Sequence, residues 1–144
     1  MKKIGVIVGR FQVPVLHAGH CHLIDTVGRL CDRVLVVLGC TDTVSTRNPF
    51  SRDTRETMLR NSYPQILITH IEDRHSDKQW SRKLDTIIAD LFPEDTITLY
   101  GSRKSFLSAY TGRFPTVFLP PIDAPSGTDV RKEYFMRMKK QRLV

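Results

Sequence analysis

The chain has 144 residues, a length typical of one domain with its own hydrophobic core. Apolar residues make up 40% and charged residues 26%, a globular balance that excludes a disordered or fibrous chain. The 22 Lys and Arg outnumber the 15 Asp and Glu, and the net charge of +7 points either to an anionic partner or simply to solubility.

No apolar run approaches the roughly 20 residues that a membrane-spanning helix needs. The apolar run after Met1 also ends at Gly9, too early for a signal peptide. We therefore expect a cytoplasmic protein with no membrane partner. The three cysteines (Cys21, Cys31 and Cys40) are an odd number without Cys-x-x-Cys spacing, so we expect reduced and mostly buried thiols.

Short apolar runs alternate with amphipathic helical patterns, which is typical of βαβ units. In chain order the expected strands are Ile4–Val8, Val34–Leu38, Ile66–Ile71, Thr96–Tyr100 and Thr116–Leu119. The expected helices begin near Gly19, cover Arg52–Arg60, Trp80–Leu91 and Lys104–Tyr110, and begin again after Ser126. The expected fold class is α/β: a three-layer α/β/α sandwich around a parallel sheet of about five strands, in one domain over residues 1–144. Such sheets bind ligands at the carboxyl ends of their strands.

The turn after the first expected strand carries residues suited to phosphate. Gly9 to Gln12 reads Gly-Arg-Phe-Gln, and His17 to His20 reads His-Ala-Gly-His at the start of a helix. Free amides and the helix dipole attract anions there. Gly19 leaves room for a ligand, the histidines can donate hydrogen bonds, and Arg10 offers a planar fork. The pattern predicts a phosphate site.

Two other interpretations of the histidines stay open. His17, His20, His22 and Cys21 could form a metal cluster, although this spacing does not place four ligands on one helical face. The histidines could also be helix caps or surface residues.

A second candidate phosphate site lies near the other end of the chain. Residues Pro125 to Arg131 follow a proline-rich loop and open the last expected helix. Ser126 or Thr128 can cap this helix and leave the next amides free for an anion. Taken alone, the segment fits a simple N-cap equally well.

Together the two motifs resemble the nucleotidyltransferase superfamily, which also holds the class I aminoacyl-tRNA synthetases. His17 to His20 is similar to its H-x-G-H signature, and Ser126 to Arg131 is similar to the S-G-T-x-V-R motif of its adenylyltransferases. The family pattern runs G-R-F-Q-P-x-H-x-G-H, whereas this chain has two extra residues between Gln12 and His17, which predicts a bulge in the loop.

The resemblance implies an ATP site and a set of catalytic residues. The implied ATP-binding residues are Gly9, Arg10, Phe11, His17, Gly19, His20, Gly101, Arg103, Ser126, Gly127, Thr128 and Arg131. The implied catalytic residues are Arg10, His17, His20 and Arg131. By the same resemblance, Mg²⁺ is expected on the ATP phosphates, and no metal site made of protein ligands alone is expected.

Two interior segments narrow the resemblance to nicotinamide-nucleotide adenylyltransferases, of the archaeal type and of the bacterial type fused to a Nudix hydrolase. One segment is Thr46 to Phe50 with the helix after it, and the other runs from Asp73 to Trp80. The resemblance implies that Arg47 contacts phosphate and that Asp73 and Trp80 bind nicotinamide mononucleotide (NMN), with the Trp80 ring on the cationic nicotinamide. Trp80 also continues an apolar helical stripe, so core packing is its alternative, and Asp73 could be a loop or capping acid.

The implied reaction is transfer of AMP from ATP to NMN, which gives NAD and pyrophosphate. A homo-oligomer is compatible with the resemblance, and no Nudix sequence is found before Val144. Two alternatives remain. The acceptor could be phosphopantetheine, FMN, a phosphosugar or phosphocholine, with ATP or CTP as donor. The chain could also be a non-catalytic nucleotide- or nucleic-acid-binding module, which the basic residues from Arg131 to Arg142 would suit, although a solvated helix explains them too.

Overall fold

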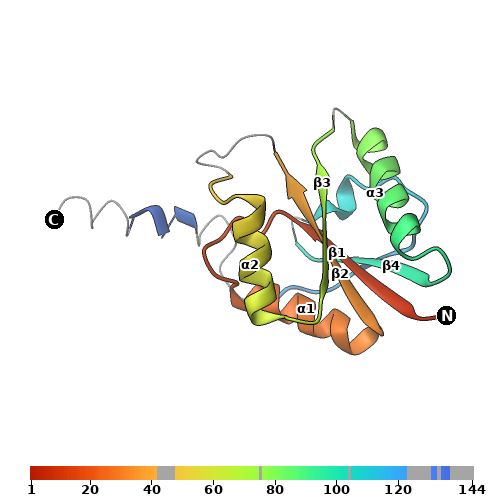
Figure 1. Cartoon of the computed structure of the whole chain (residues 1–144), viewed down its shortest axis with the longest axis horizontal. Helices are drawn as coiled ribbons and strands as arrows, with labels where there is room; N and C mark the ends of the chain where they lie inside the picture. Colours follow the sequence, from red (N-terminus) through yellow and green to blue (C-terminus); the bar gives the residue numbers. More distant parts are fainter. Residues whose placement is uncertain (42–47, 75, 104, 123–130, 133, 137–144) are drawn as a thin grey trace.

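Five parallel strands form one sheet in the computed structural model of the chain (Figure 1). The strands are β1 (Lys3–Gly9), β2 (Arg33–Cys40), β3 (Leu67–Glu72), β4 (Thr96–Gly101) and β5 (Thr116–Phe118). Their order across the sheet is β3-β2-β1-β4-β5. The structure describes residues 1–41, 48–74, 76–103, 105–122, 131–132 and 134–136.

Helices cover both faces of this sheet (Figure 1). They are α1 (Ala18–Leu30), α2 (Arg52–Ser62), α3 (Asp77–Leu91) and the single 3₁₀ turn η1 (Phe106–Ser108), and residues 131–132 and 134–136 are also helical. One core cluster joins the sheet to α1 and α2, and the other joins it to α3 and η1. The three-layer α/β fold is therefore confirmed. Among the described residues, no helix has both the length and the apolar character needed to cross a membrane.

Side chains of β1 alternate between the two core clusters. Ile4, Val6 and Val8 pack on the α3 side, whereas Ile7 packs on the α1 side. Gly5 also faces α1, where a Cβ atom would lie 2.3 Å from a methyl group of Val27. Helix α1 therefore packs directly on the backbone of β1. This close packing anchors the loop that connects the two elements.

The helix expected over Lys104–Tyr110 is wrong. Of the described residues in that range, only Phe106–Ser108 form a single 3₁₀ turn. The chain that follows is bonded to α3, since the Thr111 amide donates to Ser81 Oγ (2.9 Å) and the Tyr110 hydroxyl donates to Asp85. Ser81 thus gives the Thr111 amide, and Asp85 the Arg113 amide (3.0 Å), a partner that a longer helix would otherwise provide. The other strands and helices lie within three residues of their expected bounds, and the expected start of the last helix, after Ser126, lies outside the described residues.

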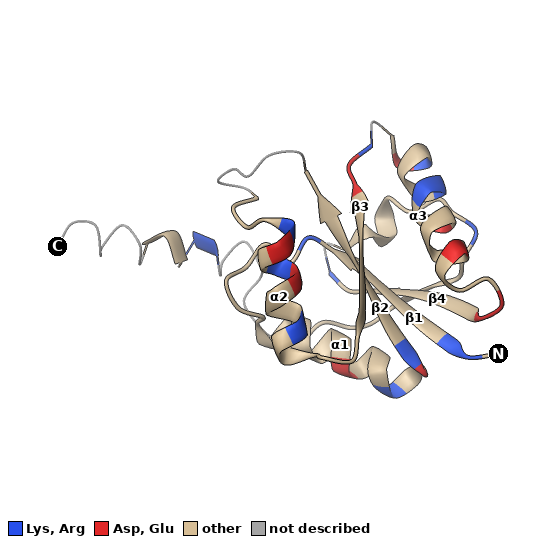
Figure 2. Ribbon diagram, viewed as in Figure 1, with Lys and Arg blue, Asp and Glu red and all other residues tan. Residues whose placement is uncertain are grey.

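The order of the strands reverses between β1 and β4. The chain runs outward from β1 to β2 and β3, and α3 then returns it to β4 on the other side of β1. At such a switch point the loops at the carboxyl ends diverge and leave a crevice. Both α2 and α3 carry charged residues of both signs (Figure 2). The described part of the surface therefore carries its positive charge in several places.

Candidate active site

A cavity of about 790 Å³ lies at the carboxyl ends of β1, β2 and β4. This volume is typical of a small-molecule site. The strand ends contribute Gly9, Gly39, Ser102 and Arg103, and the loop after β1 contributes residues 10–13. Further lining comes from α1, from Trp80 of α3, from the η1 region, from residues 119–122 and from Arg131.

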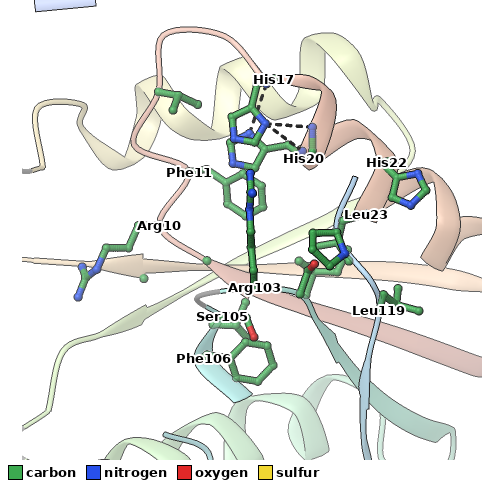
Figure 3. Close-up of a pocket in the computed structure, with 18 of the residues that line it drawn as sticks. Arg10, Phe11, His17, His20, His22, Leu23, Arg103, Ser105, Phe106 and Leu119 are labelled. Carbon is green, nitrogen blue, oxygen red and sulfur yellow. Dashed lines mark hydrogen bonds between the residues drawn. The ribbon is translucent and has the colours of Figure 1, made fainter. Parts of the chain in front are cut away.

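The imidazoles of His17 and His20 form the start of α1 (Figure 3). His17 is the N-cap residue, and its Nδ1 accepts hydrogen bonds from the amides of Gly19 (3.0 Å) and His20 (3.3 Å). The Nδ1 of His20 accepts in turn from the His17 amide (3.4 Å). The rings stack with their centroids 3.7 Å apart. Two histidines therefore form the reciprocal cap that Ser or Thr forms with Glu or Gln in the usual capping box.

This cap determines the protonation of both rings. An Nδ1 that accepts a hydrogen bond carries no proton, so the proton of each neutral ring is on Nε2. Burial lowers the pKa of His20 from 6.5 to about 3, with a further contribution from His17. Burial and then the charge of Arg103 lower the pKa of His17. Both rings are therefore neutral near pH 7, and their Nε2–H groups can donate to a ligand in the cavity.

The loop after β1 has an unusual backbone at Phe11, whose φ is 50°. A residue with a side chain rarely adopts this left-handed region, and doing so stores strain. The Phe11 ring is 7% exposed and lies 4.9 Å, between centroids, from the ring of His20. The Phe11 ring of this turn thus packs against the histidine pair through His20. The bulge expected before His17 lies in the same loop.

Arg10 and Asp73 form an ion pair of 2.6 Å across the ends of β1 and β3. Both side chains are about half exposed, at 45% and 48%. Figure 3 shows the guanidinium of Arg10 pointing away from the two imidazoles. Two residues that the sequence assigned to different substrates are therefore each other's partners in the structure.

Two other arginines line the cavity, Arg103 and Arg131. Arg103, which follows β4, extends toward the stacked imidazoles (Figure 3). Arg131 reaches back to the loop after β1, where its Nη1 donates to the carbonyl of Gln12 (3.1 Å). These cations and the neutral histidines give the cavity the donors that a polyphosphate requires.

The predicted acceptor residues are only partly described. Trp80 lies on the first turn of α3 and lines the cavity, with its ring centroid 6.1 Å from that of Phe106. It also packs against the core cluster on that face, so the structure is compatible with both interpretations of this residue. Arg47, Ser126, Gly127 and Thr128 lie outside the described residues.

The predicted glycines differ in their placement. Gly9 and Gly19 line the cavity, whereas Gly101 lies behind it. A Cβ atom on Gly101 would come within 2.6 Å of Ser105 Oγ, so this glycine allows the η1 region to pack closely on β4. Within the described residues, no group of three or more His, Cys, Asp or Glu side chains could hold a metal ion.

Two buried polar residues at the cavity, Gln12 in its lining and Arg55 outside the lining, were not predicted from the sequence. Gln12 is 4% exposed and Arg55 of α2 is 3% exposed. A signal for Arg55 exists in the sequence, since it lies four residues before the buried Leu59 and therefore on the inward face of α2. Gln12 stood inside a recognised motif but was given no role.

Comparison with known proteins places this geometry in context. The model of the family described as cytidylyltransferase-like matches residues 6–132. No curated protein matches the sequence.

Several solved structures share the fold. A bifunctional NMN adenylyltransferase/ADP ribose pyrophosphatase from Francisella tularensis, complexed with AMP and a manganese ion, has a TM-score of 0.79 and 21% identity, over 94% of this chain and 42% of that one. The NadR protein in complex with NAD and AMP-PNP has a TM-score of 0.64 and 21% identity, over 99% of this chain and 42% of that one. A lipopolysaccharide core biosynthesis protein from Thermoplasma volcanium has a TM-score of 0.56 and 14% identity, over 85% of this chain and all of that one. At these identities the likeness is one of fold, and this chain spans less than half the length of the first two proteins.

Proposed function

The chain belongs to the cytidylyltransferase-like family, and from this premise we propose that it is an adenylyltransferase that transfers AMP from ATP to NMN, giving NAD and pyrophosphate. The observation that carries the proposal is the histidine cap at the strand-end cavity. Its two neutral imidazoles carry Nε2–H donors in a cavity that Arg103 and Arg131 also line, an arrangement suited to phosphate oxygens.

The reaction needs no covalent intermediate. An oxygen of the acceptor's 5′-phosphate forms a bond to the α-phosphorus of ATP. The bond from this phosphorus to the oxygen that bridges to the β-phosphate breaks, and its electron pair leaves with pyrophosphate. The acceptor phosphate is already ionised near pH 7, so no side chain has to remove a proton from it. The protein's tasks are alignment and charge stabilisation.

The residues of the cavity divide these tasks. His17 and His20 donate through Nε2–H to phosphate oxygens of ATP, and Arg103 and Arg131 balance the charge that develops during transfer. Arg10 leaves Asp73 to contact a phosphate, which costs little because a half-exposed ion pair contributes about 1 kcal/mol or less. Ser126, Gly127 and Thr128 complete the phosphate site by their resemblance to the family motif.

NMN is assigned to the side of the cavity near α3. Trp80 lines this side, and an aromatic face attracts a cationic pyridinium ring. By resemblance, Asp73 just after β3 is the acceptor for the carboxamide, and Arg47 contacts the NMN phosphate. The fold relatives from Francisella and the NadR protein, which are described with AMP, NAD or an ATP analogue, support a dinucleotide product.

Mg²⁺ enters this proposal as part of the substrate, Mg·ATP. Phosphate oxygens and water are the ligands it prefers. The described lining suits this arrangement, since its charged side chains are Arg10, Arg103 and Arg131, and the nearby carboxylate of Asp73 is paired with Arg10.

The test is pyrophosphate release and product formation with purified protein. We expect rapid turnover with NMN and ATP, and little with phosphopantetheine, FMN, phosphosugars or phosphocholine paired with ATP or CTP. Fast turnover of another pair would change the acceptor and keep nucleotidyl transfer. No pyrophosphate from any pair would contradict an enzymatic function and favour a nucleotide-binding module.

A further inference from the structure

Two residues of the loop after β1, Arg10 and Gln12, are held by residues far away in the sequence. The Arg10 carbonyl accepts from Arg55 Nη1 (2.7 Å), and the Gln12 carbonyl accepts from Arg131 Nη1 (3.1 Å). The Gln12 side chain bonds to the backbone of Phe50 in both directions, from Nε2 to the carbonyl (3.0 Å) and from the amide to Oε1 (2.8 Å). Between them, Phe11 has its left-handed backbone. We call Gln12 and Arg55 the clasp of this turn.

Arg55 is an unusual residue for its position. At 3% exposure, its recorded partners among the described residues are the carbonyls of Arg10, Gly39 and Ser51 and the thiol of Cys40. None of these partners is a carboxylate. A buried guanidinium is costly, and an apolar side chain of similar size would often stabilise the fold better. Its specific contribution is geometric, because Nη1 lies 2.7 Å from both the Arg10 and Gly39 carbonyls and so ties the end of β1 to the end of β2.

The turn at residues 10–12 contacts residues assigned to ATP and also a residue assigned to NMN. On one side, the Phe11 ring lies against His20, and the Gln12 carbonyl holds Arg131. On the other side, Arg10 pairs with Asp73. A shift of this turn therefore moves the groups assigned to ATP relative to those assigned to NMN.

We propose that the clasp of Gln12 and Arg55 positions this turn so that the two substrates are aligned for in-line transfer. The inference rests on the proposed function for the identity of the substrates. Gln12 lines the cavity with its side chain bonded to the Phe50 backbone, and Arg55 lies outside the lining; both act as positioning residues. In-line attack requires the reacting atoms about 3 to 3.5 Å apart, and a displacement of about 1 Å can cost on the order of 100-fold in rate. Binding of each substrate alone tolerates such a shift much better.

The test separates kcat from binding in three variants: Gln12→Met, Arg55→Met and Arg55→Lys. For Gln12→Met and Arg55→Met we expect kcat to fall by about 10- to 100-fold. The dissociation constants for ATP and for NMN, each measured alone by calorimetry, should stay within about threefold of wild type. Arg55→Lys keeps the positive charge but loses the planar guanidinium with its several N–H donors. Its kcat should therefore lie between that of wild type and that of Arg55→Met.

Tyr63→Phe is the matched control. The Tyr63 hydroxyl, just after α2, bonds to Asp25 (3.0 Å) and to the Cys21 carbonyl (3.4 Å) of α1, and Tyr63 does not line the cavity. We expect this variant to lose stability and to keep the wild-type kcat. A purely structural clasp gives a different result: the loss of kcat would follow the loss of thermal stability, and activity would return at lower temperature. That result, or a wild-type kcat in the stable clasp variants, would overturn the inference.

A further measurement is independent of the proposed function. Amide exchange of the Phe50 N–H should become at least about tenfold faster in Gln12→Met, because its acceptor is removed, while the amide of Ile7 within β1 stays protected. Unchanged exchange at Phe50 would refute the clasp even if NMN is not the acceptor. If wild type uses another acceptor, the proposed function fails and the comparison of kcat with binding is made with that acceptor.

Discussion

His17 and His20 begin α1 and line the cavity at the same time, so their removal affects both helix and function. We expect His20→Ala to lower turnover by about 100-fold or more, because one donor to the transferred phosphate is lost. The fold should persist, since His17 still caps Gly19. Steady-state kinetics and circular dichroism check both points. Near wild-type NAD formation would contradict the role assigned to His20.

The same residue predicts how stability depends on pH. In the folded state the pKa of His20 is about 3, against 6.5 in an unfolded chain. Below pH 6.5 the unfolded state therefore binds a proton that the folded state excludes, and the free energy of unfolding falls as pH decreases toward 3. The slope is at most about 1.4 kcal/mol per pH unit for one group.

Urea unfolding of wild type and His20→Gln at several pH values measures this effect. Above neutral pH the free energy of unfolding of wild type should not vary through His20. Below it, wild type should lose stability more steeply than the variant, while His17 and His70, whose pKa values are also lowered, contribute the same trend to both proteins. If the free energy of unfolding changed with pH in parallel in the two proteins, His20 would not have the lowered pKa described.

Trp80 is the only tryptophan of the chain, which makes it a direct reporter of the cavity. Binding of NMN should quench its fluorescence with saturation. In Trp80→Leu, the KM for NMN should rise by about 5- to 30-fold through the lost cation–π contact, with the KM for ATP unchanged. Trp80→Phe should recover part of the effect. Lower thermal stability with an unchanged KM for NMN would instead identify a core residue.

At the scale of elements, the contact between β1 and α1 depends on a glycine. Gly5→Ala places a Cβ atom against Val27 and should destabilise the fold by about 1 to 3 kcal/mol. Gly28→Ala is the matched control, because nothing lies within 4 Å of its new Cβ atom within α1. It should stabilise the fold by about 0.5 to 1 kcal/mol. Equal effects of the two variants in thermal unfolding would contradict this packing.

Elements with their own periodic pattern could be predicted from the sequence, and elements determined by distant partners could not. The strand at Ile4–Val8 and the helix around Leu84 and Ile88 carry their burial in local spacing. The chain after Phe106 does not, since its conformation depends on side chains of α3 more than 20 residues earlier.

The candidate site divides in the same way. The motifs predicted that His17, His20, Arg103 and Arg131 would share one cavity, and they do. The supports of the turn were missed because Gln12 bonds to a backbone 38 residues away and Arg55 to one 45 residues away. A sequence motif readily identifies residues that contact a ligand. It identifies much less readily the residues that hold those contacting residues in place.

For the whole molecule, the net charge of +7 predicts electrostatic attraction of polyanionic substrates. Raising the ionic strength from about 20 to about 200 mM should lower kcat/KM for ATP, because the screening length shortens from about 20 Å to below 10 Å. Arg103→Gln should reduce this dependence more than Arg29→Gln, which removes the same charge at the far end of α1. Equal slopes for the two variants would indicate that total charge, and not its place at the cavity, governs association.

The histidine cap also has a consequence for proton exchange with the solvent. An imidazole nitrogen that accepts a hydrogen bond from a backbone amide cannot take up a proton without breaking the cap of α1. Both imidazoles therefore bind an anion as uncharged groups. Nucleotide binding through them should release or absorb no protons near neutral pH. The enthalpy of this contact is then independent of the ionisation heat of the buffer, and the affinity it provides is protected from modest acidification.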